Sequence, residues 1–333
     1  MRILVTGATG FVGGEVVRRL RGRADVSVLV RGRDGVPAAA RAAGLGDVRV
    51  VEGEVGGGLG EVGGHDVVLH CAGDTTFFPK DLAAYRRGHV DGAVELLRAS
   101  RPRVFLHVST AFVCGTRSGE VREDEGRRGQ GFHNPYEEHK LLAEEALAAA
   151  ARELGVDLRV ARPSIVVGDA PPTAGGGPSE KVYGFVRLVR DLAWTGGGVR
   201  EQVRIVGIKR ARFNMVPVDY VADGLVELAR SPAAAGGTFH LVAEAPTQEE
   251  LFGTIAERAG LPGLRVVERR EQLRAPSAIE TAIQAGLGRY RDYLRHDVEF
   301  DDARARDVLA GIPRPSLTGR GLARFVDQAL ERR

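Results

Sequence analysis

Residues 5–13 read VTGATGFVG and lie between a strand-like run, Arg2 to Thr6, and a helical pattern. Gly7 suits the tight turn that ends the strand, Gly10 lets the backbone approach a ligand closely, and Gly13 allows the helix to pack close to the strand. Free amide groups at the start of such a helix favour an anion. The segment therefore predicts a turn that binds the diphosphate of a dinucleotide.

Short runs of valine, isoleucine and leucine alternate with helical patterns along the first half of the chain, which is typical of βαβ units in a parallel sheet. The predicted fold class is α/β, a doubly wound parallel sheet (Rossmann) with a smaller C-terminal substrate lobe. We expect seven strands, near Arg2 to Thr6, Val26 to Val30, Val48 to Val51, Val67 to His70, Val104 to Val108, Leu158 to Ala161 and Thr238 to Val242.

Three helices also have clear signals. One is expected over Pro135 to Leu154, because proline suits a first helical turn and Gly155 suits the end. A second has a single apolar stripe of Val90, Ala93, Val94 and Leu97. A third, near the end of the chain, has a stripe that we expect to be a packing face, made by Leu322, Phe325, Val326, Ala329 and Leu330.

The strand and helix alternation stops after about Gly168, where the chain becomes rich in proline and glycine, and it returns at Asn214 to Val242. We therefore predict an NAD(P)-binding domain made of residues 1–168 and 212–242. Residues 169–211 and 243–333 are predicted to form a substrate-binding lobe.

Composition narrows the classes of protein and of partner. The net charge of +3 is small and bases are interleaved with acids, so the electrostatic pattern of a nucleic-acid binder is missing. Only Cys71 and Cys114 occur, and no Cys/His spacing suggests a metal site. A strand-like run from Arg2 leaves no room for a signal peptide, and no apolar stretch approaches the roughly 18 residues of a membrane span. We expect a soluble protein of the reducing cytoplasm, without a metal.

The end of the second strand, Leu29-Val30-Arg31-Gly32-Arg33, bears on the choice of cofactor. An acidic residue there would bind a ribose diol, whereas an arginine suits a 2′-phosphate. The sequence therefore favours NADPH (NADP+) over NADH. The alternative is that Arg31 and Arg33 are ordinary surface arginines.

Hydroxyl groups follow the fifth strand, at the edge where open α/β sheets bind ligands. Tyr136 and Lys140 come about 25 residues after Thr110 and share one helical face, because they are four residues apart. A tyrosine with the ordinary pKa of about 10 needs a nearby cation that stabilises its phenolate, and Lys140 can supply that charge. Thr110 can hydrogen-bond a carbonyl oxygen on which negative charge develops. These residues predict acid–base chemistry at a carbonyl group.

In their order and spacing these motifs resemble the extended short-chain dehydrogenase/reductase family, over roughly residues 1–242. The segments HVSTAFV, NPYEEHKLLAE and MVPVDYVADGLVEL are more similar to its thioester-reductase and fatty-acyl-CoA-reductase branch than to the sugar-nucleotide epimerases. The tail around Tyr293-Leu294 and Val298 to Asp301 is weakly similar to the same branch. The family's motifs stand here as TGATGFVG (6–13), HCAG (70–73), STAF (109–112), YEEHK (136–140) and RPSIVVG (162–168).

The resemblance implies a role for each matching residue. Thr110, Tyr136 and Lys140 would form a catalytic triad, with Tyr136 and Lys140 also touching the cofactor. Arg31 would bind the 2′-phosphate, and Glu54-Val55 would border the adenine. The remaining residues implied to bind the cofactor are Gly7, Thr9, Gly10, Phe11, Val12 and Gly13 at the diphosphate, Cys71, Ala72 and Gly73 along the cofactor, and Pro163, Ile165 and Val166 near the nicotinamide.

The sequence departs from the family pattern at two positions. His89 stands where the family often has asparagine, and Glu54 follows Gly53 where the family often has aspartate. The first change affects any tether or proton relay that the asparagine would provide, although a histidine can still hydrogen-bond. The second substitutes a longer acid beside the adenine.

The resemblance implies NADPH-dependent hydride transfer to a carbonyl, in natural-product or lipid metabolism. No adenylating or carrier segment is visible in the 333 residues, so we expect the substrate to arrive as an aldehyde, a ketone or a thioester on CoA or an acyl-carrier protein. One alternative is an NDP-sugar epimerase, dehydratase or reductase, which shares the fold and triad. Another is a regulator that senses NADP without chemistry, against which the Tyr136 and Lys140 pair argues.

Two further groups of residues remain open between a functional role and a structural one. The basic residues Arg204, Lys209, Arg210 and Arg212 can meet a phosphopantetheine phosphate or an acidic carrier-protein helix, or form a solvated loop. Asp74 and the pair Phe77-Phe78 follow the fourth strand, where they can contact substrate or pack.

Overall fold

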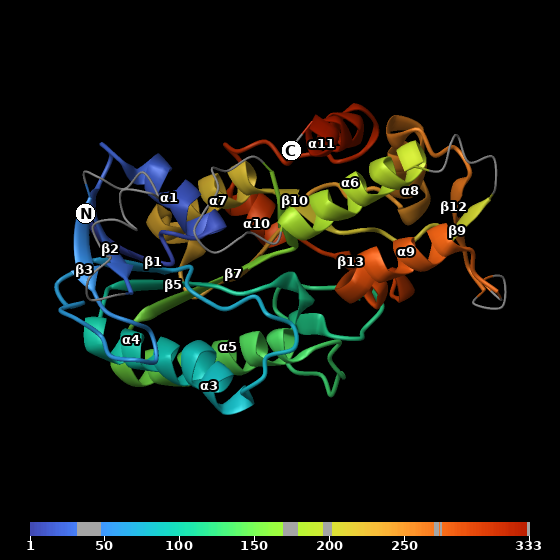
Figure 1. The fold of residues 1–333 in the computed structure, drawn as a ribbon. Helices are drawn as coiled ribbons and strands as arrows, with labels where there is room; N and C mark the ends of the chain where they lie inside the picture. The colour runs from blue at the N-terminus through green and yellow to red at the C-terminus, as the bar shows by residue number, and fades with distance from the viewer. Residues whose placement is uncertain (32–47, 169–178, 196–201, 270–272, 274, 332–333) are drawn as a thin grey trace.

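The computed structural model describes residues 1–31, 48–168, 179–195, 202–269, 273 and 275–331 (Figure 1). Its centre is a seven-stranded sheet in the order β11-β7-β5-β4-β1-β2-β3, with every neighbouring pair parallel. The order reverses between β1 and β4, as in a doubly wound sheet. All seven predicted strands are confirmed: β1 (Arg2–Thr6), β2 (Asp25–Val30), β3 (Arg49–Glu52), β4 (Val67–His70), β5 (Val104–Val108), β7 (Asp157–Pro163) and β11 (Thr238–Leu241).

Helices cover both faces of this sheet. Helices α1 (Phe11–Leu20) and α7 (Val218–Arg230) contact each other on one face, and α4 (Gly92–Ser100) and α5 (Pro135–Leu154) contact each other on the opposite face (Figure 1). The central strands β4 and β5 are buried along their whole length, because both faces are covered.

Helix α5 has the bounds that the sequence predicts. The side chain of Asn134 accepts a hydrogen bond from the Glu137 amide at its start, and Gly155 ends it with a φ of 67°. The apolar stripe around Val90 belongs to a longer run, which begins with α3 (Leu82–Arg86) and passes through a π-helical turn, η1 (Arg87–Asp91), before α4.

Three small parallel sheets were not predicted. Their strands have only three or four residues, which is too short to show a periodic pattern. They pair β8 (Ile165–Val167) with β10 (Met215–Pro217), β9 (Val203–Val206) with β12 (Leu264–Val267), and β6 (Gly119–Val121) with β13 (Val298–Phe300).

The remaining helices gather beside one end of the sheet. Helix α6 (Ser179–Thr195) contacts α8 (Gln248–Ala259), α9 (Ala278–Leu287) and α11 (Gly319–Glu331). The predicted packing face of α11 is confirmed, since Leu322, Phe325, Val326 and Ala329 are buried and Leu330 packs partly against the same core. The glycine- and proline-rich stretch at 169–178 lies outside the described residues.

The C-terminal segment also returns to the first part of the chain, because β13 pairs with β6 in a separate small sheet. It reaches the main sheet through α10 (Ala303–Val308), which contacts β11. The division into two lobes stays a prediction.

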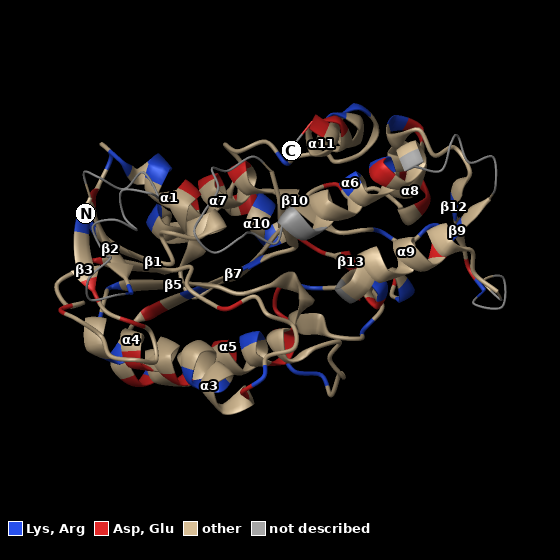
Figure 2. Cartoon of the chain, viewed as in Figure 1, with Lys and Arg blue, Asp and Glu red and all other residues tan. Residues whose placement is uncertain are grey.

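Basic and acidic residues are interspersed along the outer helices (Figure 2). Within the described ranges no helix is long and apolar enough to cross a membrane.

Candidate functional site

The turn between β1 and α1 needs glycine at two positions. Gly7 has a φ of 71°, and a Cβ atom on it would lie 2.7 Å from the Ala72 amide nitrogen. A Cβ atom on Gly13 would lie 2.2 Å from the Gly7 carbonyl oxygen. A Cβ on Gly10 would meet only the Gly7 oxygen, at 3.1 Å, so this residue faces open space on its other sides. The turn is therefore closely packed against backbone at Gly7 and Gly13, and has open space beside Gly10.

The first amides of α1 are free to meet an anion. Gly10 caps the helix without a side-chain hydrogen bond, and the first bond of the helical pattern runs from the Gly14 amide to the Gly10 carbonyl at 2.9 Å. The ring of Phe11 is buried in the core, so this residue offers a ligand its backbone and not its side chain. Thr9 and Val12 are partly exposed. This cradle fits a diphosphate group.

The structure brings together the two side chains predicted at the adenosine end. A guanidinium nitrogen of Arg31 lies 3.5 Å from a carboxylate oxygen of Glu54, and the two side chains are 79% and 52% exposed. Val55 packs partly against the core under β4 and β5. Arg33 lies outside the described residues.

The segment after β4 lies directly behind the glycine turn. The Ala72 amide donates to the Thr6 hydroxyl at 3.1 Å, and Gly73 is exposed. Burial raises the pKa of the Cys71 thiol to about 12, so Cys71 packs rather than reacts. At the end of β7 and in β8, Pro163 and Val166 are buried and Ile165 is partly exposed.

The three predicted catalytic residues converge at the carboxyl edge of the sheet. The Lys140 ammonium is buried, donates to the Val108 carbonyl at 2.9 Å, and lies 5.9 Å from the centre of the Tyr136 ring. Thr110 is the second residue after β5, and its hydroxyl lies 3.5 Å from the Pro163 carbonyl. Tyr136 stacks on Phe77 with ring centres 6.0 Å apart.

The charge balance at Tyr136 differs from the sequence prediction. Although part of Tyr136 is exposed, burial raises the pKa of its hydroxyl, and the charge of Glu137 and the nearby Tyr290 raise it further. Burial also lowers the pKa of Lys140 to about 8. The loss of hydration outweighs the attraction between phenolate and ammonium. The protonated phenol is the stable form here, which suits a residue that gives up a proton only when a product oxygen takes it.

His89, the departure from the family pattern, lies in the π-helical turn η1. Its Nε2 atom is 2.9 Å from the Asp74 carbonyl oxygen, and its Nδ1 atom is 3.1 Å from that of Tyr85. The Tyr85 hydroxyl donates to the same Asp74 carbonyl at 2.9 Å. A Cβ on Gly73 would lie within 3.5 Å of both His89 Nε2 and Lys140 Nζ. His89 therefore holds the loop after β4 beside the lysine.

The predicted basic stretch is not one patch. Arg204 pairs with Glu280 of α9, Lys209 lies 3.5 Å from Glu249, and Arg212 lies 4.0 Å from Glu299. Arg210 is exposed. Of the other open candidates, Phe77 packs among Tyr136, Tyr290 and Tyr293, whereas Phe78 is 62% exposed.

A buried polar cluster next to Tyr136 escaped the sequence reasoning. The Glu137 carboxylate is fully buried and binds the ring of His133, the amide of Asn134 and the hydroxyl of Tyr293. Tyr293 is 156 residues from Glu137 in sequence, so no local pattern connects them. The segment NPYEEHKLLAE and the weak tail similarity around Tyr293 are the sequence signals near this cluster, and neither connects Glu137 with Tyr293.

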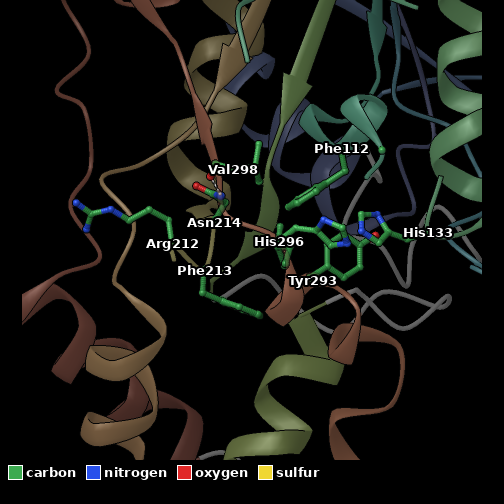
Figure 3. Close-up of a pocket in the computed structure, with 10 residues that line it drawn as sticks. Phe112, His133, Arg212, Phe213, Asn214, Tyr293, His296 and Val298 are labelled. Carbon is green, nitrogen blue, oxygen red and sulfur yellow. Dashed lines mark hydrogen bonds between the residues drawn. The ribbon is translucent and has the colours of Figure 1, made fainter. Parts of the chain in front are cut away.

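This cluster borders a narrow pocket (Figure 3). Asn214 donates to the Val298 carbonyl at 2.9 Å across one wall. The pocket is lined by Phe112, Gly115, His133, Ile165, Arg212, Phe213, Asn214, Tyr293, His296 and Val298. Across the part of the chain that the structure describes, no group of three or more His, Cys, Asp or Glu side chains can hold a metal ion.

Comparison with known proteins identifies relatives of two kinds. The family model described as "Male sterility protein" matches residues 62–225. The nonribosomal peptide synthetase asaC of Aspergillus flavus is 24% identical over 283 residues, which are 74% of this chain and 26% of that protein. The dTDP-glucose 4,6-dehydratase of Streptomyces griseus is 28% identical over 310 residues, 86% of this chain and 88% of that protein. The chain thus spans about a quarter of the synthetase.

Solved structures share the fold. The terminal R domain of the myxalamid PKS-NRPS pathway superposes with a TM-score of 0.77 at 23% identity, covering 98% of this chain and 90% of that one. A thiolation-reductase di-domain of an archaeal non-ribosomal peptide synthetase gives 0.73 at 17% identity, covering 98% and 74%. UDP-glucuronic acid 4-epimerase of Bacillus cereus, in complex with NAD, gives 0.68 at 19% identity, covering 99% and 96%.

The matched family model, the motif order from the glycine turn to the strand after α5, and the shared fold agree with one another. The glycine turn is the part of this fold that takes a nicotinamide dinucleotide. The family model matched over residues 62–225 and the shared fold support membership of the extended short-chain dehydrogenase/reductase family, in its thioester-reductase-like branch, with a fold that binds NAD(P).

Proposed function

We propose that this protein uses NADPH to reduce the carbonyl group of an acyl thioester to an aldehyde, and that of an aldehyde to an alcohol, in natural-product metabolism. The observation that carries the proposal is the position of three side chains at the carboxyl edge of the sheet. Lys140 bonds the last carbonyl of β5 and lies beside the Tyr136 ring, and Thr110 follows that strand end by two residues. A protonated tyrosine, a buried ammonium and a hydroxyl suit a carbonyl that gains a hydride and then a proton.

Each residue has a distinct task in this reaction. When bound, NADPH supplies the hydride to the carbonyl carbon. Thr110 hydrogen-bonds the carbonyl oxygen as negative charge develops, and Tyr136 donates its proton to that oxygen. The resulting hemithioacetal expels the thiol and leaves the aldehyde. Once Tyr136 has given up its proton, the positive charge of the Lys140 ammonium stabilises the negative phenolate. The other hydrogens of the ammonium can bond the cofactor ribose.

The proposed preference for NADPH rests on Arg31. Its guanidinium follows β2, is 79% exposed, and lies 3.5 Å from the carboxylate of Glu54. Such an exposed pair is worth little and is readily exchanged for a phosphate. The remaining residues proposed to hold the cofactor are those predicted from the sequence.

A carrier-bound thioester is the substrate class that the relatives favour. One of the similar structures is named as the terminal R domain of a PKS-NRPS pathway, and another as a thiolation-reductase di-domain of a non-ribosomal peptide synthetase. The similarity to a dTDP-glucose 4,6-dehydratase keeps sugar nucleotides as the competing substrate class.

Steady-state NADPH oxidation with a panel of substrates tests the proposal. The panel contains octanoyl-CoA, octanoyl-carrier protein, octanal, a polycyclic ketone and dTDP-glucose. We expect turnover of the thioesters and octanal, and Tyr136→Phe should lower it at least about 10²-fold, the usual lower value for general acid catalysis. Cofactor affinity should barely change, because the ring remains.

The matched control is Tyr220→Phe, which removes a buried hydroxyl from α7 on the other side of the sheet. Both variants must keep the thermal midpoint of the wild type. Near-full turnover by Tyr136→Phe would show that the acid lies elsewhere. Conversion of dTDP-glucose alone would favour the sugar-nucleotide alternative, and tight NADP+ binding without any turnover would favour a sensor.

A further inference from the structure

The ring of His133 has one nitrogen fixed by a buried carboxylate. Its Nδ1 atom lies 3.0 Å from an oxygen of Glu137, whose side chain is fully buried. A carboxylate accepts hydrogen bonds, so in the neutral imidazole Nδ1 carries the proton and Nε2 carries the lone pair. This assignment follows from the bonding partners of the ring.

The carboxylate that fixes His133 is itself held in place. The Tyr293 hydroxyl and the Asn134 amide donate to one oxygen of Glu137, and the His133 backbone amide donates to the other at 3.0 Å. The His133 ring also stacks on Tyr293, with ring centres 5.0 Å apart, and meets the edge of His296 at 4.6 Å. The position of Nε2 is therefore set by four neighbouring side chains.

This fixed nitrogen lacks a partner. The His133 side chain is only 5% exposed, and Nε2 is among the buried polar atoms that make no hydrogen bond to the residues of the described ranges. Buried polar atoms in folded proteins almost always have a partner, because leaving one unpaired costs about 1 to 3 kcal/mol. A hydrogen-bond donor from outside the chain is the group that this site lacks.

The pocket beside His133 can hold such a group. Phe112, Phe213 and Val298 give it apolar walls, while Asn214 and His296 add polar atoms (Figure 3). It has room for about one water-sized group, so it suits a single oxygen and not a bulky head group. A hydroxyl fits best, because it can donate to Nε2 and still accept from a second polar neighbour.

The pocket lies close to the proposed reaction site. His133 precedes Tyr136 by three residues, and Phe112 follows Thr110 by two. The Phe77 ring contacts both Tyr136 and Tyr293, with ring centres 6.0 Å apart in each case. The rings of Tyr293 and Phe77 therefore lie between His133 and Tyr136. An acyl chain whose carbonyl reacts at Tyr136 would reach His133 several bonds further along.

We propose that this pocket binds a hydroxyl group on the acyl chain of the substrate, and that His133 determines this specificity by accepting its hydrogen bond at Nε2. The inference rests on the proposed reduction of an acyl substrate and adds which acyl chains it prefers. His133 acts in binding and takes no part in the proton transfer.

A series of aldehydes tests this specificity. We compare octanal with octanals that carry a hydroxyl at carbon 6, 7 or 8, measuring kcat/KM for NADPH oxidation. One hydroxyl position should raise kcat/KM about tenfold, the effect of one good hydrogen bond. His133→Phe keeps an aromatic ring against Tyr293 and lacks Nε2, so the preference should disappear. The matched control His65→Phe changes a buried histidine at the opposite edge of the sheet and should keep the preference.

A binding measurement separates this inference from the proposed reaction. The alkanediol that corresponds to the preferred aldehyde is added to the NADP+-bound protein, with octan-1-ol as the control, and the ring ¹⁵N resonance of His133 Nε2 is recorded. The diol alone should shift this resonance in the unmodified protein. Absence of aldehyde turnover together with a diol-induced shift would refute the reaction and keep the pocket. Equal kcat/KM for all four aldehydes, a preference that survives in His133→Phe, or no shift with any diol would overturn the inference.

Discussion

Gly13→Ala tests the closest backbone contact of the cofactor-binding turn. A Cβ on this residue would lie 2.2 Å from the Gly7 carbonyl oxygen, whereas ordinary contacts begin at 3.4 Å, so the two atoms must separate by about 1.2 Å (3.4 minus 2.2). The atoms that this Cβ would meet are all backbone, and Gly7 is already committed to a φ of 71°, so no flexible side chain can absorb the movement.

The expected cost follows from two opposing effects. Crowding of this kind costs typically 1 to 3 kcal/mol, while alanine in a helix gains about 1 kcal/mol over glycine. We expect the free energy of unfolding to fall by up to about 2 kcal/mol and the thermal midpoint to fall by a few degrees. Displaced amides at the start of α1 should weaken cofactor binding at least about tenfold, or 1.4 kcal/mol.

Urea unfolding and a fluorescence titration with NADPH measure the two effects. Gly253→Ala is the matched control, because Gly253 lies inside α8 and a Cβ there meets no atom within 4 Å. The control should gain up to about 1 kcal/mol and keep its cofactor affinity. The reasoning is refuted if Gly13→Ala gains stability like the control, or binds NADPH as tightly as the unmodified protein.

Other substitutions and conditions test the rest of the site. Arg31→Ala should reduce the ratio of NADPH to NADH affinity about tenfold, and Glu54→Gln should raise it by freeing the guanidinium; equal ratios in all three proteins would contradict the assignment. Burial lowers the pKa of Lys140 to about 8, so its ammonium form prevails below that pH. We therefore expect kcat to fall as the pH rises through about 8. A flat profile of kcat to about pH 9.5 would count against a role for the ammonium. Charge reversal at Lys209 and Arg210 should raise KM for octanoyl-CoA and octanoyl-carrier protein and spare octanal, whereas a uniform loss would indicate a folding defect.

Local sequence signals account for the main sheet and for α5. Strands such as β4 and β5 are continuous apolar runs because both faces of the sheet are covered. Asn134, Pro135 and Gly155 mark both ends of α5. Features set by distant contacts could not be predicted in this way. The π-helical turn that contains His89 depends on contact with the loop after β4, and the pairing of Glu137 with Tyr293 forms only when the C-terminal segment packs.

In the candidate site too, local sequence predicts some features, and contacts made only in the folded chain determine the others. The order of residue types along the chain is enough to suggest Thr110, Tyr136 and Lys140 as one group. The direction of the Tyr136 pKa shift depends on how much protein surrounds the hydroxyl, and this is a property of the folded site. The unpaired nitrogen of His133 likewise has no counterpart in a sequence pattern.

The position of β11 in the chain has a consequence for synthesis on the ribosome. This strand begins at Thr238, whereas its neighbour β7 ends at Pro163, and the Glu123 carboxylate beside β6 accepts hydrogen bonds from the His240, Arg304 and Ala305 amides. Until these residues leave the exit tunnel, the nascent chain exposes the open edge of β7 and a buried acid without its donors. Open strand edges recruit other chains. Translation that slows between residues 163 and 238 should therefore increase aggregation, and a nascent chain that stalls there depends on a chaperone to cover β7.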